Sequence, residues 1–253
     1  MPVSRMKRSS LCVLMLPVML LLSHSARAAD RIVFSGGAPL YTYQPATIVP
    51  LLKEAFRRND REFDARFYPS QRSLRSSNSG ETDGELHRIY DFHKVSGNKY
   101  PNLLRIESRL MSVYMAVFST KDIKVKDINS LQGQTILYQS GRKNLEQMLR
   151  GLKTKNVIRT AGTDKKAFTL LARGRADIVI SESFLGETII SAQPSLANIR
   201  EVGRLNETPI YAYIHKKHRA LGTDIASTLE AMKEDGSFKK ITSSVRSRLL
   251  AGQ

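Results

Sequence analysis

A short polar segment, Gln139-Ser140-Gly141-Arg142, is the first candidate for binding chemistry because a segment with helical periodicity follows it directly. The first N–H groups of a helix have no partner within the helix, and together with the helix dipole they attract an anion. A serine hydroxyl and a guanidinium group would add donors that suit a carboxylate. Ser140 and Arg142 are therefore candidate contacts for the anionic end of a small molecule. A capping serine and a solvated arginine are the alternative interpretation.

Two tyrosines could supply an aromatic wall for the same small molecule. Tyr41 and Tyr43 come after a loop that is marked by Gly36, Gly37 and Pro39. Small-molecule pockets are lined mainly by apolar and aromatic side chains, with a few polar groups that fix orientation. A buried position in the core is the alternative for each tyrosine.

Signatures of metal binding and catalysis are weak in this sequence. The histidines beyond the N-terminal segment have no convincing metal-ligand spacing: His87, His93, His215 and His218. We find no nucleophile elbow, phosphate-binding loop or catalytic triad signature. We therefore expect no metal, no cofactor and no catalytic residue.

Alternating strand and helix patterns must position these groups. Apolar or alternating runs predict strands at 31–35, 63–68, 112–118, 135–138, 176–180 and 209–215. Apolar residues at three- and four-residue spacing predict helices near 48–56, 144–152, 165–173, 224–234 and 236–248. Strands that alternate with helices indicate βαβ units and mostly parallel sheets. Two such sets predict an α/β protein of two lobes rather than one continuous sheet.

The same alternation predicts the domain organisation. Residues 29–118 would form lobe 1, and residues 119–209 would form lobe 2. Residues 210–253 would return by a crossover strand and end in helices that pack on lobe 1. Ligands of such open sheets lie at the carboxyl ends of the strands.

Residues 1–28 have the three zones of a cleaved secretory signal peptide. A basic start is followed by an apolar run from Leu11 to Leu22 and by small residues that end at Ala28. The apolar run has about 12 residues, whereas a membrane-spanning helix needs roughly 20. Cleavage would also remove Cys12, which is the only cysteine. We therefore expect a soluble, monomeric periplasmic product without disulfides.

The chain is strongly basic, with 40 Lys and Arg against 23 Asp and Glu and a formal net charge of +17. The leader contains four basic residues and no acid, so its removal leaves +13. A basic surface can favour nucleic acid, anionic lipid or an acidic small ligand. Export and the scattered placement of the basic residues argue against nucleic acid. A solvated basic surface and an anionic ligand group remain as interpretations.

Five segments together resemble the bacterial extracellular solute-binding proteins of family 3, the periplasmic receptors of polar amino-acid uptake. They cover 37–41, 79–84, 127–136, 171–180 and 232–241, in the family's order. The most specific is Leu171-Ala172-Arg173-Gly174-Arg175-Ala176-Asp177-Ile178-Val179-Ile180. The resemblance implies the type II periplasmic-binding fold, in which two lobes joined by two crossover strands close on a ligand and the closed form docks on an ABC transporter permease.

The resemblance also assigns a role to Glu182, five positions after Asp177: an acid at this place accepts the amine of the family's ligands. An exposed loop carboxylate paired with Arg175 is the alternative.

The family's carboxylate-binding arginine has no counterpart here, because its place falls near Lys99 or Tyr100. Either a different arginine serves, or the ligand is not an ordinary α-amino acid. Arg72, just past a predicted strand, and Arg88, five residues after Asp83, are the best substitutes. A surface salt bridge is the alternative for both. Glu85 would either hold Arg88 or contact the ligand directly.

The sequence thus predicts a periplasmic solute-binding protein that captures a small polar or charged solute, such as an amino acid, and delivers it to an ABC-type transporter. Two alternatives remain. One is a periplasmic enzyme of the same fold, a lyase of the cyclohexadienyl dehydratase type. The other is a ligand-sensing protein that acts on a separate membrane partner.

Overall fold

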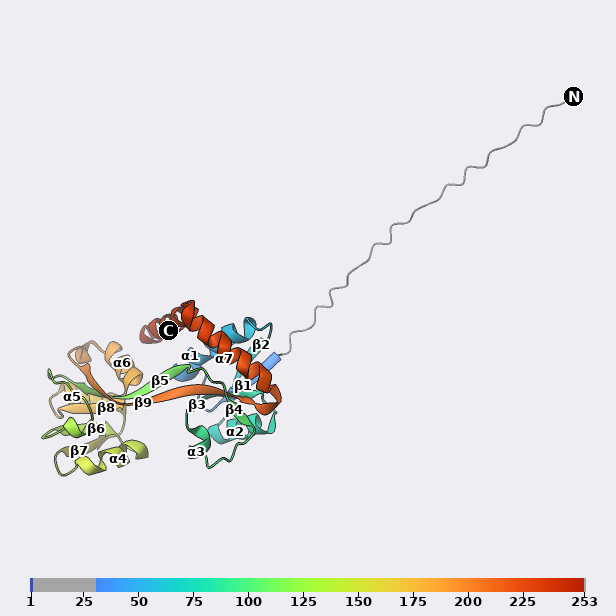
Figure 1. Ribbon diagram of the computed structural model, residues 1–253. Helices are drawn as coiled ribbons and strands as arrows, with labels where there is room; N and C mark the ends of the chain where they lie inside the picture. The colour runs from blue at the N-terminus through green and yellow to red at the C-terminus, as the bar shows by residue number, and fades with distance from the viewer. Residues whose placement is uncertain (2–30, 253) are drawn as a thin grey trace.

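The computed structural model describes Met1 and residues 31–252. The predicted signal peptide, Met1 apart, therefore lies outside the described residues. Figure 1 shows two groups of helices and strands, one on each side of a narrow waist that β5 and β9 cross. In the described part of the chain, no helix is long and apolar enough to span a membrane.

Lobe 1 is built from the N-terminal part of the described chain and from its last two long helices. Its strands are β1 (Arg31–Gly36), β2 (Glu62–Phe67), β3 (Gly84–Ile89) and β4 (Leu103–Arg105). Its helices are α1 (Tyr43–Arg57), α2 (Ser70–Ser79), α3 (Phe92–Val95), α7 (Arg219–Glu234) and α8 (Ser237–Leu250), with a 3₁₀ turn at Lys216–His218. Strands β2, β1 and β3 pair in parallel, as the βαβ pattern predicts.

Lobe 2 repeats the arrangement on a smaller scale. Its strands are β6 (Thr135–Gln139), β7 (Val157–Ala161) and β8 (Ile178–Glu182), which are parallel to one another. Its helices are α4 (Lys143–Leu149), α5 (Asp164–Ala172) and α6 (Ser183–Ser191). Three 3₁₀ turns lie at Ile128–Ser130, Arg150–Leu152 and Pro194–Leu196.

Two long strands connect the lobes: β5 (Met111–Ser119) and β9 (Arg200–His215). All of β5 pairs antiparallel with residues 200–210 of β9. The return strand was predicted at 209–215, which is wrong in its start, because pairing with β5 already begins at Arg200. In lobe 2, β5 also pairs with β8, and in lobe 1, β9 pairs with β3 and β4. The chain therefore changes lobe within these two strands, near Val113 and Thr208, which are partners in the ladder.

The prediction of two separate sheets is wrong at the level of hydrogen bonding. Because β5 and β9 belong to both lobes, the strands form one hydrogen-bonded sheet in the order β2-β1-β3-β9-β5-β8-β6-β7. The hydrophobic cores nevertheless remain separate. Lobe 1 contains a large cluster around Phe34, Phe56 and Leu229 and a smaller one around Phe92 and Tyr213. Two clusters, around Phe168 and around Ile136, cover the two faces of the lobe 2 sheet.

An aspartate fixes the start of one strand in each lobe. Asp83 precedes β3 and accepts a hydrogen bond from the N–H of Val33 in β1 (2.9 Å). Asp177 precedes β8 and accepts one from the N–H of Thr135 in β6 (2.7 Å). These are the aspartates of two segments that carry the family resemblance, and in this structure they hold neighbouring strands in register. Hydrogen bonds to the charged form lower the pKa of the Asp177 carboxylate, chiefly those from Lys121 and the Thr135 backbone.

Candidate functional site

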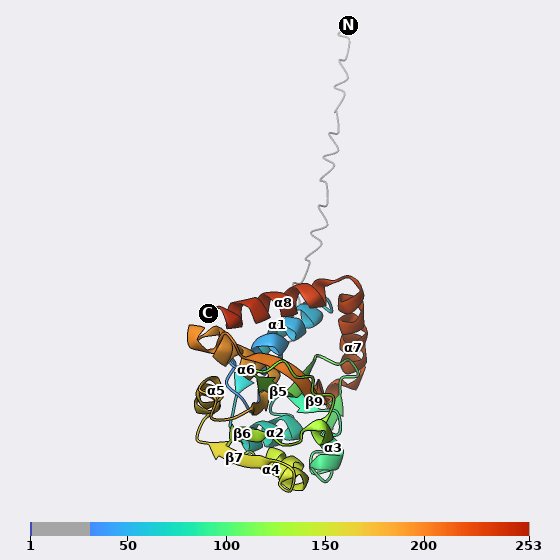
Figure 2. The same cartoon turned by 90° about the vertical axis from the view of Figure 1, so that its left-hand side faces the viewer.

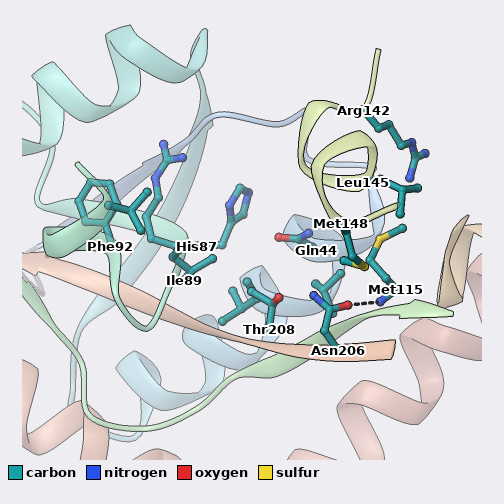
Figure 3. A pocket seen from close by; sticks show the side chains of 14 residues that line it. Gln44, His87, Ile89, Phe92, Met115, Arg142, Leu145, Met148, Asn206 and Thr208 are labelled. Carbon is teal, nitrogen blue, oxygen red and sulfur yellow. Dashed lines mark hydrogen bonds between the residues drawn. The ribbon is translucent and has the colours of Figure 1, made fainter. Parts of the chain in front are cut away.

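A cleft of about 890 Å³ lies between the lobes, against β5 and β9. Figure 3 shows it with side chains from lobe 1 on one side, from lobe 2 on the other, and from the connecting strands at its base. Its described polar lining consists of Gln44, His87, Arg88, Arg142, Asn206 and Thr208. The remaining lining is apolar and includes Phe92 from α3 on the lobe 1 side and Met148 from α4 on the lobe 2 side.

Arg88 reaches the cleft from the carboxyl end of β3. The register of β3 against β9 shifts between Glu85 and Arg88, so both side chains lie on the same side of the strand. Arg88 Nη2 donates a 2.6 Å hydrogen bond to Oε1 of Glu85, which is fully buried. Ser73 Oγ donates to the other carboxylate oxygen at 2.6 Å. Arg88 Nε is buried, and no described residue accepts a hydrogen bond from it.

Burial raises the pKa of the Glu85 carboxyl, and the nearby guanidinium of Arg88 and the Ser73 hydroxyl act in the opposite direction. A buried carboxylate beside one arginine restricts the arginine to few rotamers. The Glu85–Arg88 pair expected from the sequence therefore forms, on a strand whose register shifts between the two residues.

Arg142 reaches the cleft from lobe 2, at the residue that precedes α4. Its Nη2 donates to Oδ2 of Asp164 at 2.6 Å, and its Nε donates to Gln139 Oε1 at 3.1 Å. Asp164 is nearly buried and its other oxygen accepts a 2.8 Å hydrogen bond from Ser181. Arg142 and Arg88 thus have matching surroundings, since a buried acid of its own lobe holds each.

Ser140 does not line the cleft. Its side chain is exposed, and its N–H donates to the carbonyl of Ala161 at the end of β7. The backbone donor that was expected to face a ligand is therefore used within lobe 2.

Tyr43 contributes to the junction of the lobes rather than to the lining of the cleft. Its ring stacks on Phe184 of α6, with centroids 3.6 Å apart and an angle of 14° between the planes. The guanidinium of Arg246 in α8 lies over the Phe184 ring, 5.3 Å from its centroid. Arg246 also forms an ion pair with Glu187 of α6. Burial raises the pKa of Tyr43, which the nearby Arg246 partly offsets. The neighbouring Gln44 is the residue of α1 that lines the cleft.

Figure 2 places α8 and α6 on one side of the molecule, and α3 and α4 on the opposite side. The lobes touch on the first side, through α6 and α8. The cleft lies on the second side, because α3 and α4 supply its lining.

Tyr41 and Arg72 lie away from the cleft. Tyr41 is 79% exposed and borders a surface groove between α1 and α8. Arg72 is an exposed residue of α2 whose guanidinium covers the ring of Tyr68 at 4.6 Å.

Glu182 ends β8 beside the cleft but does not line it. It is half-buried and is the strand partner of Met115, which does line the cleft. Burial raises the pKa of the Glu182 carboxyl, Arg142 lowers it, and Asp164 raises it further. Its position is therefore close to the arginine of lobe 2 and not at the surface of the cleft.

His87 is a lining residue that the sequence did not indicate. It is nine-tenths buried, and its Nε2 has no hydrogen-bond partner among the described residues. Burial and the charge of Arg88 lower its pKa to about 4, so the imidazole is neutral near pH 7. The rule that indicated Arg88, that ligands lie at the carboxyl ends of strands, could also have indicated His87, its neighbour in β3. Asn206 and Thr208 were missed because β9 was expected to begin after them.

Comparisons with known proteins agree with this architecture. No family model matches the chain. An uncharacterized protein of Shewanella oneidensis is 28% identical over 183 residues, 70% of this chain and 67% of the relative. The crystal structure of YckB from Bacillus subtilis superposes with a TM-score of 0.68 at 19% identity, covering 86% of this chain and 91% of that chain.

Two further solved structures have different stated roles. Substrate-binding domain 2 of Lactococcus lactis GlnP, in an open conformation, matches with a TM-score of 0.64 at 16% identity, covering 85% of this chain and 95% of that one. A histidine kinase sensor domain with similarity to periplasmic binding proteins matches with a TM-score of 0.52 at 17% identity, covering 85% and 96%. The chain therefore has the type II periplasmic-binding fold, and the predicted fold class is confirmed. Its solved neighbours include amino-acid-binding proteins of the family that the sequence resembles.

Proposed function

We propose that the protein is an exported solute-binding protein that captures a small solute between its lobes and presents it to a membrane partner. One observation carries the proposal: an arginine from each lobe, Arg88 from lobe 1 and Arg142 from lobe 2, lines the same cleft. A solute that accepts hydrogen bonds from both would join the lobes and favour the closed arrangement.

Each arginine is held in position by an acidic residue of its own lobe. Glu85 and Asp164 hold the two guanidinium groups by hydrogen bonds of 2.6 Å before any ligand arrives. Preorganised donors improve affinity because less side-chain entropy is lost on binding. The cleft volume, about 890 Å³, suits a small molecule.

Delivery to an ABC-type transporter is the simplest use of such a capture step. The resemblance to substrate-binding domains supports it, and an interlobe closure that reports occupancy is what a transporter can recognise. Ligand sensing for a separate membrane partner is the second candidate, which the match to a kinase sensor domain favours. The two uses share the same cleft and differ in the partner that binds the closed form.

A thermal-shift screen of residues 29–253 against amino acids, polyamines and small organic acids tests the capture step. A specific ligand should raise the melting temperature with increasing concentration, because it binds only the folded state. We expect Arg88→Ala and Arg142→Ala to remove the shift and Arg72→Ala to keep it, since Arg72 is an exposed arginine outside the cleft. Loss of the shift in all three variants, or in none, would refute the assignment of the cleft. Mass spectrometry of the ligand after incubation distinguishes binding from turnover by a lyase.

A further inference from the structure

We infer that the cleft takes a monocarboxylate with an apolar body and no ammonium group. This inference rests on the proposed function and specifies the class of solute. It follows from the charges that line the cleft, from the donors that remain free, and from the apolar side chains around them.

The charge of the lining argues against an α-amino acid. Two arginines and a neutral histidine line the cleft, and its described lining contains no Asp or Glu. An ammonium group that leaves water without a carboxylate or several carbonyl oxygens to bind it is unfavourable. The lining therefore offers no counterpart for the amino group.

The free donors suit one carboxylate. Each arginine uses Nη2 for the acid of its own lobe, and Arg142 also uses Nε for Gln139. A guanidinium has five N–H donors in total, so each arginine keeps others. Arg88 Nε is buried and without a described acceptor, so a ligand oxygen would satisfy it. Arginine donors match the planar geometry of a carboxylate.

The charge balance limits the ligand to a single negative charge. Glu85 and Asp164 already offset the two guanidinium groups. The cleft therefore has no excess of positive charge of the kind that a phosphate dianion would need. Among anions, a monoanion that takes the unused N–H groups adds the smallest unbalanced charge.

The remaining lining indicates an apolar body. Phe92 and Val95 come from lobe 1, Met115 lies on β5, and Leu145 and Met148 come from α4. Methionine side chains adapt to irregular apolar shapes, so the cleft can enclose a branched or aromatic tail. Burying that tail gives the ligand its affinity, and the arginines fix its orientation.

Glu182 is the acid that an amino-acid ligand would need. It lies on β8, one strand away from the lining, and is the ladder partner of Met115. If closure of the lobes brought it to the ligand, it would accept the ammonium, and the inference would fail. The variant Glu182→Gln separates the two cases, because an amide keeps the shape of the side chain and loses the negative charge.

Matched ligand pairs test the inference directly. Hexanoate and norleucine have the same carbon chain, and so do 3-phenylpropanoate and phenylalanine; only the amino compounds have an α-ammonium group. Isothermal titration of wild type, Glu182→Gln, Arg142→Lys and Arg72→Lys with all four compounds is the experiment. The comparison of pairs on wild type stands even if a variant folds poorly.

We expect at least one carboxylate to bind wild type tenfold or more tightly than its amino counterpart. That affinity should persist in Glu182→Gln and Arg72→Lys and fall in Arg142→Lys. Tighter binding of the amino compound, lost in Glu182→Gln, would overturn the inference and leave the proposed solute-binding function intact. Failure of all four compounds with a folded protein would overturn the inference, and failure of the wider solute screen as well would overturn the proposed function too.

Discussion

Tyr43, at the start of α1 in lobe 1, and Phe184, in α6 of lobe 2, stack with ring centroids 3.6 Å apart. This contact and the ion pair between Arg246 and Glu187 join α1 and α8 to α6. The lobes are therefore connected at two places, by the paired strands β5 and β9 and by this junction.

Tyr43→Ala should weaken the junction. Aromatic pairs contribute about 0.5–1.5 kcal/mol beyond area burial, so the free energy of unfolding should fall by about that amount. Urea unfolding of the variant and of wild type measures the change. Tyr41→Ala is the matched control, because this tyrosine, two residues away, is exposed. Equal effects of the two variants would contradict the role of the junction.

His87 should make stability depend on pH. Its folded pKa is about 4, against an ordinary value of 6.5, so between these values the unfolded chain binds more protons than the native one. Its contribution to stability is complete above pH 6.5 and is lost as pH falls toward 4. We expect a loss of about 2 kcal/mol between pH 7.5 and pH 5.

Urea unfolding of wild type and His87→Gln at both pH values measures this contribution. The variant should lose less stability than wild type over the same interval, by about 2 kcal/mol. An identical loss in both proteins would show that His87 titrates normally.

Asp177→Ala should reduce stability without reducing ligand affinity, because its carboxylate holds β6 and β8 in register at the end of lobe 2 away from the cleft. Loss of the bonds from Thr135 N–H and Lys121 should lower the free energy of unfolding by about 1–3 kcal/mol. Asp122→Ala is the control, since the Asp122 side chain is 95% exposed. A ligand affinity that falls in Asp177→Ala while the free energy of unfolding stays constant would contradict the structural role.

The sequence predicted the elements whose patterning is strong. The apolar face of α1 and the buried run of β8 bury their side chains as expected. Other elements were missed for physical reasons. Strand β7 lies at the edge of the sheet and is largely exposed, and α6 follows β8 directly without a loop. The first half of β9 is charged and partly exposed, because it crosses the waist between the lobes.

The candidate site was predicted only in part for a related reason. Arg88 and Arg142 were found because each lies at the end of a strand or before a helix, and that position depends on local sequence. Tyr43 was expected in the cleft, yet its partner Phe184 lies on a helix that the sequence did not reveal. Which side chains meet across the lobes depends on the crossing of β5 and β9, which no local pattern encodes.

The central claim is that one ligand joins the two lobes, and small-angle scattering of residues 29–253 tests it most directly. Saturating wild type with a ligand of measured affinity should reduce the radius of gyration, as the lobes close on Arg88 and Arg142. A ligand that binds stoichiometrically and leaves the scattering curve unchanged would contradict the account.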